Sequence, residues 1–166
     1  SHNEAEFQRK CTNILEDFAK KAGFGRDFLP REEYSLINGR PDAVYNRFII
    51  EYERPGSLRD RNSYHHNQHA IGQVKRYLEG LERRERRKME RLAGVVFDGH
   101  YFIFVRQRES VWHIDDPLPV DTTSTRRFLR TLVSLSTELA LVPENLIRDF
   151  GEKSKTAEKL VRALYQ

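Results

Sequence analysis

The sequence predicts an α/β domain, in which a mixed central sheet of about five strands is flanked by helices. Three patterns predict it. Residues 42–53 read as two short β-branched and aromatic strands around a tight turn. Residues 64–81 carry apolar side chains at helical spacing. Residues 92–106 hold two further apolar runs, separated by the strong hairpin signal Asp98-Gly99.

An amphipathic helix is predicted near the beginning of the chain. Its apolar face consists of Phe7, Cys11, Ile14, Leu15, Phe18 and Ala22. Glu4 falls on this same face, whereas Glu6 points away from it. The positive end of the helix dipole also favours an acid at a helix start, so Glu4 has a structural explanation as well as a functional one.

The two strands within residues 42–53 are predicted to form a hairpin through Asn46-Arg47. This turn places Asp42 directly opposite Glu51. Glu53 lies on the same face as Glu51, because strand side chains alternate with period two. Like charges placed opposite one another destabilise a sheet, so three converging acids need open solvent or a cation. Hard divalent ions take such oxygen ligands, and the two readings are a metal site or a solvated strand end.

The segment 64–81 is predicted to be a helix beside this hairpin. Its buried stripe consists of Ala70, Val74, Leu78 and Leu81. Gln73 and Tyr77 are four residues apart and share a face, which His66 and His69 continue toward the helix start. Neither His has a Cys partner nearby, which argues against structural zinc. The alternative is a polar border beside a core stripe.

The second half of the chain completes the α/β pattern. Strands are predicted at residues 92–97, 101–106 and 111–114, and helices at 124–139, 141–151 and 155–165. The helix 124–139 has Phe128, Leu129, Leu132 and Leu135 as its apolar stripe. Asp98 and Asp115 could be acids of a site, but turn chemistry explains both better.

Three short motifs occur in order: Pro41-Asp42 at the first strand, Glu51-Tyr52-Glu53 at the end of the second, and Gln73 with Tyr77 on the helix. This set resembles the PD-(D/E)xK nucleases, in the RecB-like branch, which have Asp, Glu-x-Lys and Gln-x-x-x-Tyr in this order. The resemblance covers roughly residues 4–115 and implies a restriction-endonuclease-like fold. Glu53 stands where the family has Lys. Some restriction endonucleases with Glu-x-Glu still cut DNA, whereas in others loss of the Lys accompanies loss of activity.

The resemblance implies a metal-dependent DNA endonuclease. The implied catalytic residues are Asp42, Glu51, Glu53, Gln73 and Tyr77, and the implied ligands of Mg²⁺ or Mn²⁺ are Asp42, Glu51 and Glu4. The backbone carbonyl of Tyr52 would help to hold the ion. Glu53 would bind a second metal or accept a proton from the attacking water, and the Gln73 and Tyr77 pair would orient the site. The alternatives are a catalytically degenerate module that binds DNA for a partner domain, or a protein-interaction domain.

Basic residues flank these motifs in the sequence. The candidate contacts to the DNA backbone are Arg59, Arg61, Arg76, Arg83, Arg84, Arg86 and Arg87. The chain carries a net charge of +4 and has an isoelectric point near 9.3, which fits an anionic partner. The alternative is a solvated helix with charge pairs of mixed sign.

Composition predicts a protein without a membrane span, since no run approaches about 18 apolar residues. The single cysteine, Cys11, excludes an internal disulfide, and we expect a reducing cytoplasm. Residues 1–140 are predicted to be the nuclease-like domain. Residues 141–166 resemble the connector to an adenine-specific DNA methyltransferase domain in restriction–modification proteins, so such a domain is an expected partner. A homodimer is also expected, because cutting both strands often needs two sites.

Overall fold

The computed structural model describes residues 2–22, 30, 35–37 and 39–136 of the 166-residue chain. The helices predicted at 141–151 and 155–165, and the domain boundary predicted after residue 140, lie outside these residues. The described chain forms an α/β domain with a mixed sheet of six strands flanked by helices. The predicted fold class is therefore confirmed, with one strand more than expected.

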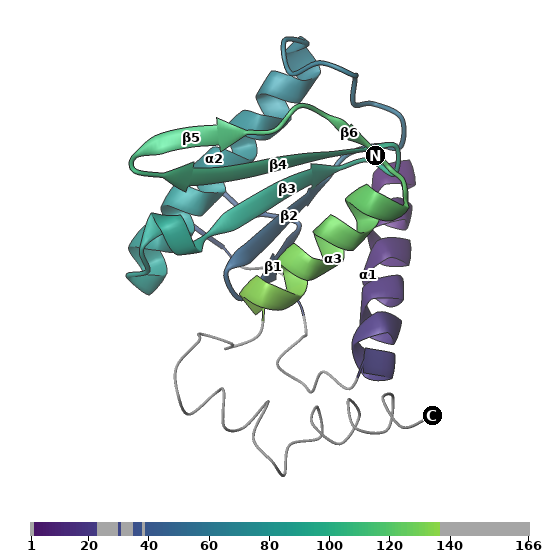
Figure 1. Ribbon diagram of the computed structural model, residues 1–166, viewed down its shortest axis with the longest axis horizontal. Coiled ribbons are helices and arrows are strands. Elements are labelled where there is room, and N and C mark those ends of the chain that lie inside the picture. Colours follow the sequence, from purple (N-terminus) through teal and green to yellow (C-terminus); the bar gives the residue numbers. More distant parts are fainter. Residues whose placement is uncertain (1, 23–29, 31–34, 38, 137–166) are drawn as a thin grey trace. The chain divides into compact units, whose positions relative to one another are not determined.

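Helices precede, separate and follow two runs of strands along the described chain. In order they are α1 (His2–Ala22), β1 (Ala43–Tyr45), β2 (Phe48–Tyr52), α2 (His65–Glu85), the 3₁₀ turn η2 (Met89–Arg91), β3 (Ala93–Phe97), β4 (Tyr101–Arg108), β5 (Val111–Ile114), β6 (Leu118–Pro119) and α3 (Thr122–Ser136). The helix α2 covers one face of the sheet, and α1 and α3 cover the other (Figure 1). None of the described helices has the length and apolar character needed to cross a bilayer.

The sheet has the strand order β1-β2-β3-β4-β5, and β6 pairs with the beginning of β4. The strands β2 and β3 are parallel and are connected through α2, whereas the other strand pairs of the sheet are antiparallel. The β1–β2 register, with Val44 opposite Ile49 and Tyr45 opposite Phe48, is the predicted one. Asn46 closes the turn at a φ of 52°, a left-handed conformation that Asn tolerates better than most residues.

Two hydrophobic clusters hold the layers together. The stripe predicted for α2 is confirmed, since Ala70, Val74, Leu78 and Leu81 are all 0% exposed. On the other face, Phe128 and Leu132 of α3 pack with the aromatic side chains of β2 and β4. The close approach of α2 to β3 depends on Gly94, where an added Cβ would lie 2.4 Å from Val74 Cγ1.

The apolar face predicted for α1 is confirmed at Phe7, Cys11, Leu15 and Phe18 and is wrong at Ile14, whereas the side chain of Ala22 lies outside the described residues. Leu15 and Ala19 are buried and Phe7 packs against the same cluster, but Ile14 is 67% exposed. The helix contacts the sheet through a narrow stripe of residues about four positions apart. A residue at the edge of the apolar face therefore faces water. Periodicity defines such a face only to within about one residue position.

The long connection between β2 and α2 is held by buried polar side chains. Asn67 is fully buried: its Oδ1 accepts from Arg59 N (3.1 Å), and its Nδ2 donates to the carbonyls of Arg59 and Arg61 (2.9 and 3.1 Å). Asp98 Oδ2 accepts from Leu58 N (2.9 Å), and its Oδ1 accepts two further backbone N–H groups. Asp98 is therefore a structural turn residue, as predicted.

Candidate functional site

The three predicted acids lie where β2 leaves the sheet, on the side that α2 covers. The backbone N–H of Tyr52 donates to Asp42 Oδ2 at 2.8 Å, so the residue before β1 reaches across to the end of β2. Glu51 alternates with Ile50 and Tyr52, which belong to the cluster under α1 and α3. Its side chain therefore points toward α2. We call this region, with Asp42, Glu51 and Glu53, the acid end of the sheet.

Glu51 is a buried carboxyl group. It is 7% exposed, and among the described residues its Oε2 has no hydrogen-bond partner. Burial, and then the charge of Asp42, raises the pKa of Glu51 to about 9. Burial, and then the charges of Glu4 and Glu53, raises the pKa of Asp42 to about 6, although the Tyr52 hydrogen bond opposes the shift. The carboxylates therefore repel one another, and because they are largely buried, water screens this repulsion only in part.

Glu53 pairs with a histidine of the covering helix. His66 Nε2 lies 3.0 Å from Glu53 Oε2 and 3.2 Å from Ser57 Oγ. Burial raises the pKa of Glu53, and the charges of His66 and His69 oppose that shift. The sequence placed both histidines on the correct line of the helix but gave them no partner.

Gln73 and Tyr77 reach the same region from α2. Tyr77 is buried, and its pKa is raised by burial and then by the charge of Glu51, while a hydrogen bond with Gln73 opposes the shift. The charge of Asp42 raises it further and that of Arg76 lowers it. The ring also lies close to Gly39, where an added Cβ would come within 2.8 Å of Tyr77 Cε1. The five predicted catalytic residues are therefore neighbours.

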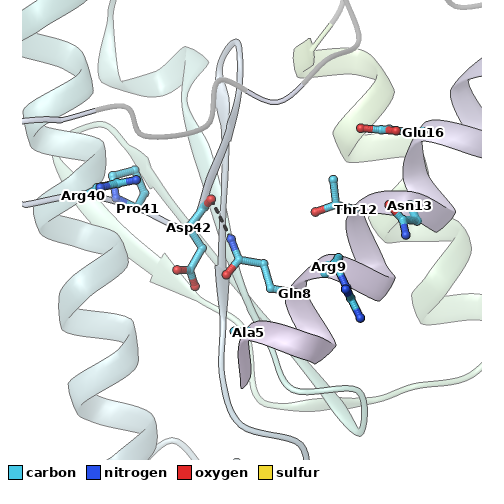
Figure 2. A pocket seen from close by; sticks show the side chains of 9 residues that line it. All are labelled: Ala5, Gln8, Arg9, Thr12, Asn13, Glu16, Arg40, Pro41 and Asp42. Atoms are coloured by element: carbon cyan, nitrogen blue, oxygen red, sulfur yellow. Dashed lines mark hydrogen bonds between the residues drawn. The ribbon is translucent and has the colours of Figure 1, made fainter. Parts of the chain in front are cut away.

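The beginning of α1 borders the acids. The charge of Glu4 raises the pKa of Asp42, Glu51 and Glu53, which places Glu4 within electrostatic reach of all three. One turn further on, Gln8 Nε2 donates to the carbonyl of Asp42 at 3.1 Å and fixes α1 against the entry to β1 (Figure 2). The role of Glu4 as a metal ligand stays a prediction.

A cleft of about 460 Å³ opens between α1 and the segment that leads into β1. Its walls are Ala5, Gln8, Arg9, Thr12, Asn13 and Glu16 of α1 and Arg40, Pro41 and Asp42 (Figure 2). Asp42 belongs to both the cleft and the acid end. The lining is mostly polar, with two guanidinium groups and two carboxyl groups, so a ligand that reaches the acids would find hydrogen-bonding partners beside them.

The predicted basic residues do not form one surface. Arg59, Arg61 and Arg76 are exposed near the acid end, and Asn67 fixes the backbone of the first two. The other four, Arg83, Arg84, Arg86 and Arg87, lie at the opposite end of α2. There Arg84 donates to the Ser35 carbonyl and Arg87 pairs with Glu85. The expectation that all seven flank the acids is wrong for these four, because α2 runs away from the acid end as it returns the chain to β3.

The oxygen atoms at the acid end are suitable ligands for a hard cation, but they are not arranged around one metal position. Several carboxylates and an orphaned buried oxygen, Glu51 Oε2, are the groups that Mg²⁺ or Mn²⁺ prefers. Within the described ranges, however, no three His, Cys, Asp or Glu side chains are already arranged to hold a metal ion. The fit therefore rests on the donor atoms and their mutual repulsion.

Comparison of the chain with protein-family models, with curated proteins and with solved structures finds no match.

Proposed function

We propose that this domain is a metal-dependent DNA endonuclease of the restriction-endonuclease-like kind. The observation that carries the proposal is Glu51, whose buried, unpartnered Oε2 lies among like charges beside Asp42. A protein of ordinary stability rarely keeps such a group unless it has a use for it. The nearby Gln73 and Tyr77 supply polar groups for a phosphate, and Arg76 supplies positive charge.

Each residue then has a definite task. Asp42 and Glu51 hold Mg²⁺ or Mn²⁺, with Glu4 near the same site. The bound ion would polarise the phosphate and lower the pKa of a bound water. Glu53 Oε2 takes the proton of the attacking water, and His66 Nε2, 3.0 Å away, stabilises the carboxylate between turnovers. The Tyr77 hydroxyl orients a phosphate oxygen.

The test is cleavage of supercoiled and linear DNA with Mg²⁺ or Mn²⁺ by the wild type, Glu51→Ala and the exposed-carboxylate control Asp17→Asn. We expect cutting by the wild type and by Asp17→Asn, and a loss of at least about 100-fold in Glu51→Ala. Equal cleavage by Glu51→Ala would refute the proposed site. Cleavage by a contaminating nuclease would also be equal in the two preparations, because the substitution does not affect that enzyme.

A degenerate, non-cleaving DNA-binding module is the second candidate, and the Glu53–His66 pair favours it. A carboxylate that is paired with a histidine at 3.0 Å is a weaker base than a free one, and the Lys of the nuclease family is missing. Under this reading the wild type binds DNA without cutting it, and Glu53→Lys restores cleavage. If Glu53→Lys also fails to cut while metal and DNA still bind, the acid end has lost more than one group.

A further inference from the structure

A second pocket lies on the other face of the sheet, at the end opposite the acids. It has a volume of about 290 Å³ and lies between α3 and the strands β3 and β4. Its lining includes Glu90, Arg91, Leu92, Ala93, Gly94, Phe104, Val105, Arg106, Arg108, Arg127, Thr131, Ser134 and Leu135. Four of these residues are arginines, which come from η2, β4 and α3. We call this the arginine pocket.

The surrounding contacts fix part of this positive charge in place. The guanidinium of Arg127 lies over the Phe104 ring, 4.3 Å from its centroid, and also bridges to Asp115. Arg47 donates to the carbonyls of Ser134 (3.1 Å) and Leu135 (3.4 Å). Arg47 thus covers the negative end of the α3 dipole, which would otherwise repel an anion at this wall.

The remaining arginines of the pocket have no carboxylate partner within the part of the chain that the structure describes. Within the described ranges, Arg91, Arg106 and Arg108 form no ion pair. Burial, and then the nearby charges of Arg87 and Arg91, lowers the pKa of Arg47, so positive charge continues beyond the pocket wall.

Few acids are available to balance this charge. Glu90 is the acidic residue among those that line the pocket, whereas Asp115 and Glu85, which lie outside the lining, pair with Arg127 and Arg87. Positive charge therefore exceeds negative charge at a concave surface.

We propose that the arginine pocket binds a phosphate group, carried either by a mononucleotide or by the 5′ end of a DNA strand. Guanidinium groups match phosphate oxygens two at a time, and several of them around one cavity fit a terminal phosphate that can enter it. The hydroxyls of Thr131 and Ser134 donate within α3, so the arginines supply the recognition. The pocket is at the small end of ligand sites, which suits a phosphate with little more than its sugar.

The experiment is calorimetric titration in phosphate-free buffer with EDTA, which removes any metal-dependent binding at the acid end. The probes are a deoxynucleoside 5′-monophosphate, the unphosphorylated deoxynucleoside, and a six-residue oligonucleotide with and without a 5′ phosphate. The variants are Arg106→Gln and Arg108→Gln, and the matched control is Arg130→Gln, an exposed arginine of α3 outside the lining.

We expect each 5′-phosphorylated probe to bind more tightly than its counterpart without that phosphate, and we expect Arg106→Gln and Arg108→Gln, but not Arg130→Gln, to weaken its binding about tenfold or more. Tighter binding of the 5′-phosphorylated oligonucleotide than of the mononucleotide identifies a strand end, and equal binding identifies a free nucleotide. No binding at millimolar concentration, equal binding without the phosphate, or equal loss in Arg130→Gln overturns the proposal. None of these results depends on whether the acid end cleaves DNA.

Discussion

Glu51 is a buried carboxyl group with no hydrogen-bond partner for Oε2 among the described residues. Its ionisation should therefore make the folded state less stable as the pH rises. Its pKa is raised from 4.5 to about 9, so the folded protein retains a proton that the unfolded chain releases. The contribution of Glu51 to stability is therefore fully present below pH 4.5. It is lost as the pH rises toward 9.

Glu51→Gln should remove this dependence, because the amide has similar shape and no charge. In EDTA we expect the variant to match the wild type near pH 4.5 and to be more stable by about 1–3 kcal/mol at pH 8. Urea unfolding at a series of pH values measures the difference, with Asp17→Asn as an exposed control. Parallel pH profiles for wild type and Glu51→Gln would contradict the burial argument.

The placement of some residues could be predicted from the sequence, and that of others could not. The register from Ala43–Ile50 to Tyr45–Phe48 was predictable, because the two-residue turn at 46–47 fixes it. Asn67 was not, because a polar residue beside an apolar stripe gives no sign that it is fully buried and bonded to a loop. The pairing of Glu53 with His66 required knowing how α2 lies across β2, which no local pattern contains.

At the scale of elements, the helix α2 packs closely on the strand β3. Gly94 has Val74 where its Cβ would be, so the helix lies directly on the strand. The helical stripe of α2 predicted which residues meet the sheet. The distance between α2 and β3 depends on the missing side chain at Gly94. This distance in turn sets where Gln73 and Tyr77 lie relative to the acids.

Gly94→Ala should therefore lower the free energy of unfolding by about 1–3 kcal/mol, because the added methyl group overpacks the layer. Gly72→Ala on α2 is the matched control. Its added Cβ meets only Arg76 Nη1, at 3.7 Å, and the substitution should stabilise the helix by up to about 1 kcal/mol. Chemical denaturation of the two variants separates the effects. Loss of stability in both would indicate that α2 does not tolerate change in general.

Element boundaries were predictable where a pattern was long. The helix predicted at 64–81 is found at 65–85, and the strands predicted at 92–97 and 101–106 at 93–97 and 101–108. The two-residue strand β6 was missed, because a pair of residues has no period and is stabilised only by β4 beside it. Tertiary contacts, rather than intrinsic preference, create such an element.

At the scale of the whole molecule, positive charge gathers at both ends of α2. This helix has 21 residues, so it spans about 30 Å, or about nine base pairs of B-DNA. Arg83 follows Tyr77 by six residues, which places it about 9 Å further along the helix axis. DNA bound at the acid end must extend along α2 to reach Arg83, Arg84, Arg86 and Arg87.

This separation predicts a dependence on DNA length, which rests on the proposed function. Replacing those four arginines by Gln should reduce kcat/KM for a 30-base-pair duplex, because four backbone contacts are lost. The loss should be smaller for a ten-base-pair duplex, because only some of its bound positions extend far enough along α2 to reach these arginines. Arg59→Gln with Arg61→Gln should reduce kcat/KM for both. Cleavage rates at several salt concentrations measure this, and an equal effect of the four substitutions on both duplexes would contradict it.

The hydrogen bonds between Arg47 and the end of α3 can form only late in synthesis, after α3 has been translated. Arg47 N donates to the carbonyl of Leu135, 88 residues later in the chain. At about 5–20 residues per second, translation needs roughly 4 to 18 s to reach that partner. The β1–β2 hairpin can close early, but its turn stays unclamped until α3 has emerged. A nascent chain that stalls before residue 135 would therefore present the acidic hairpin without its clamp.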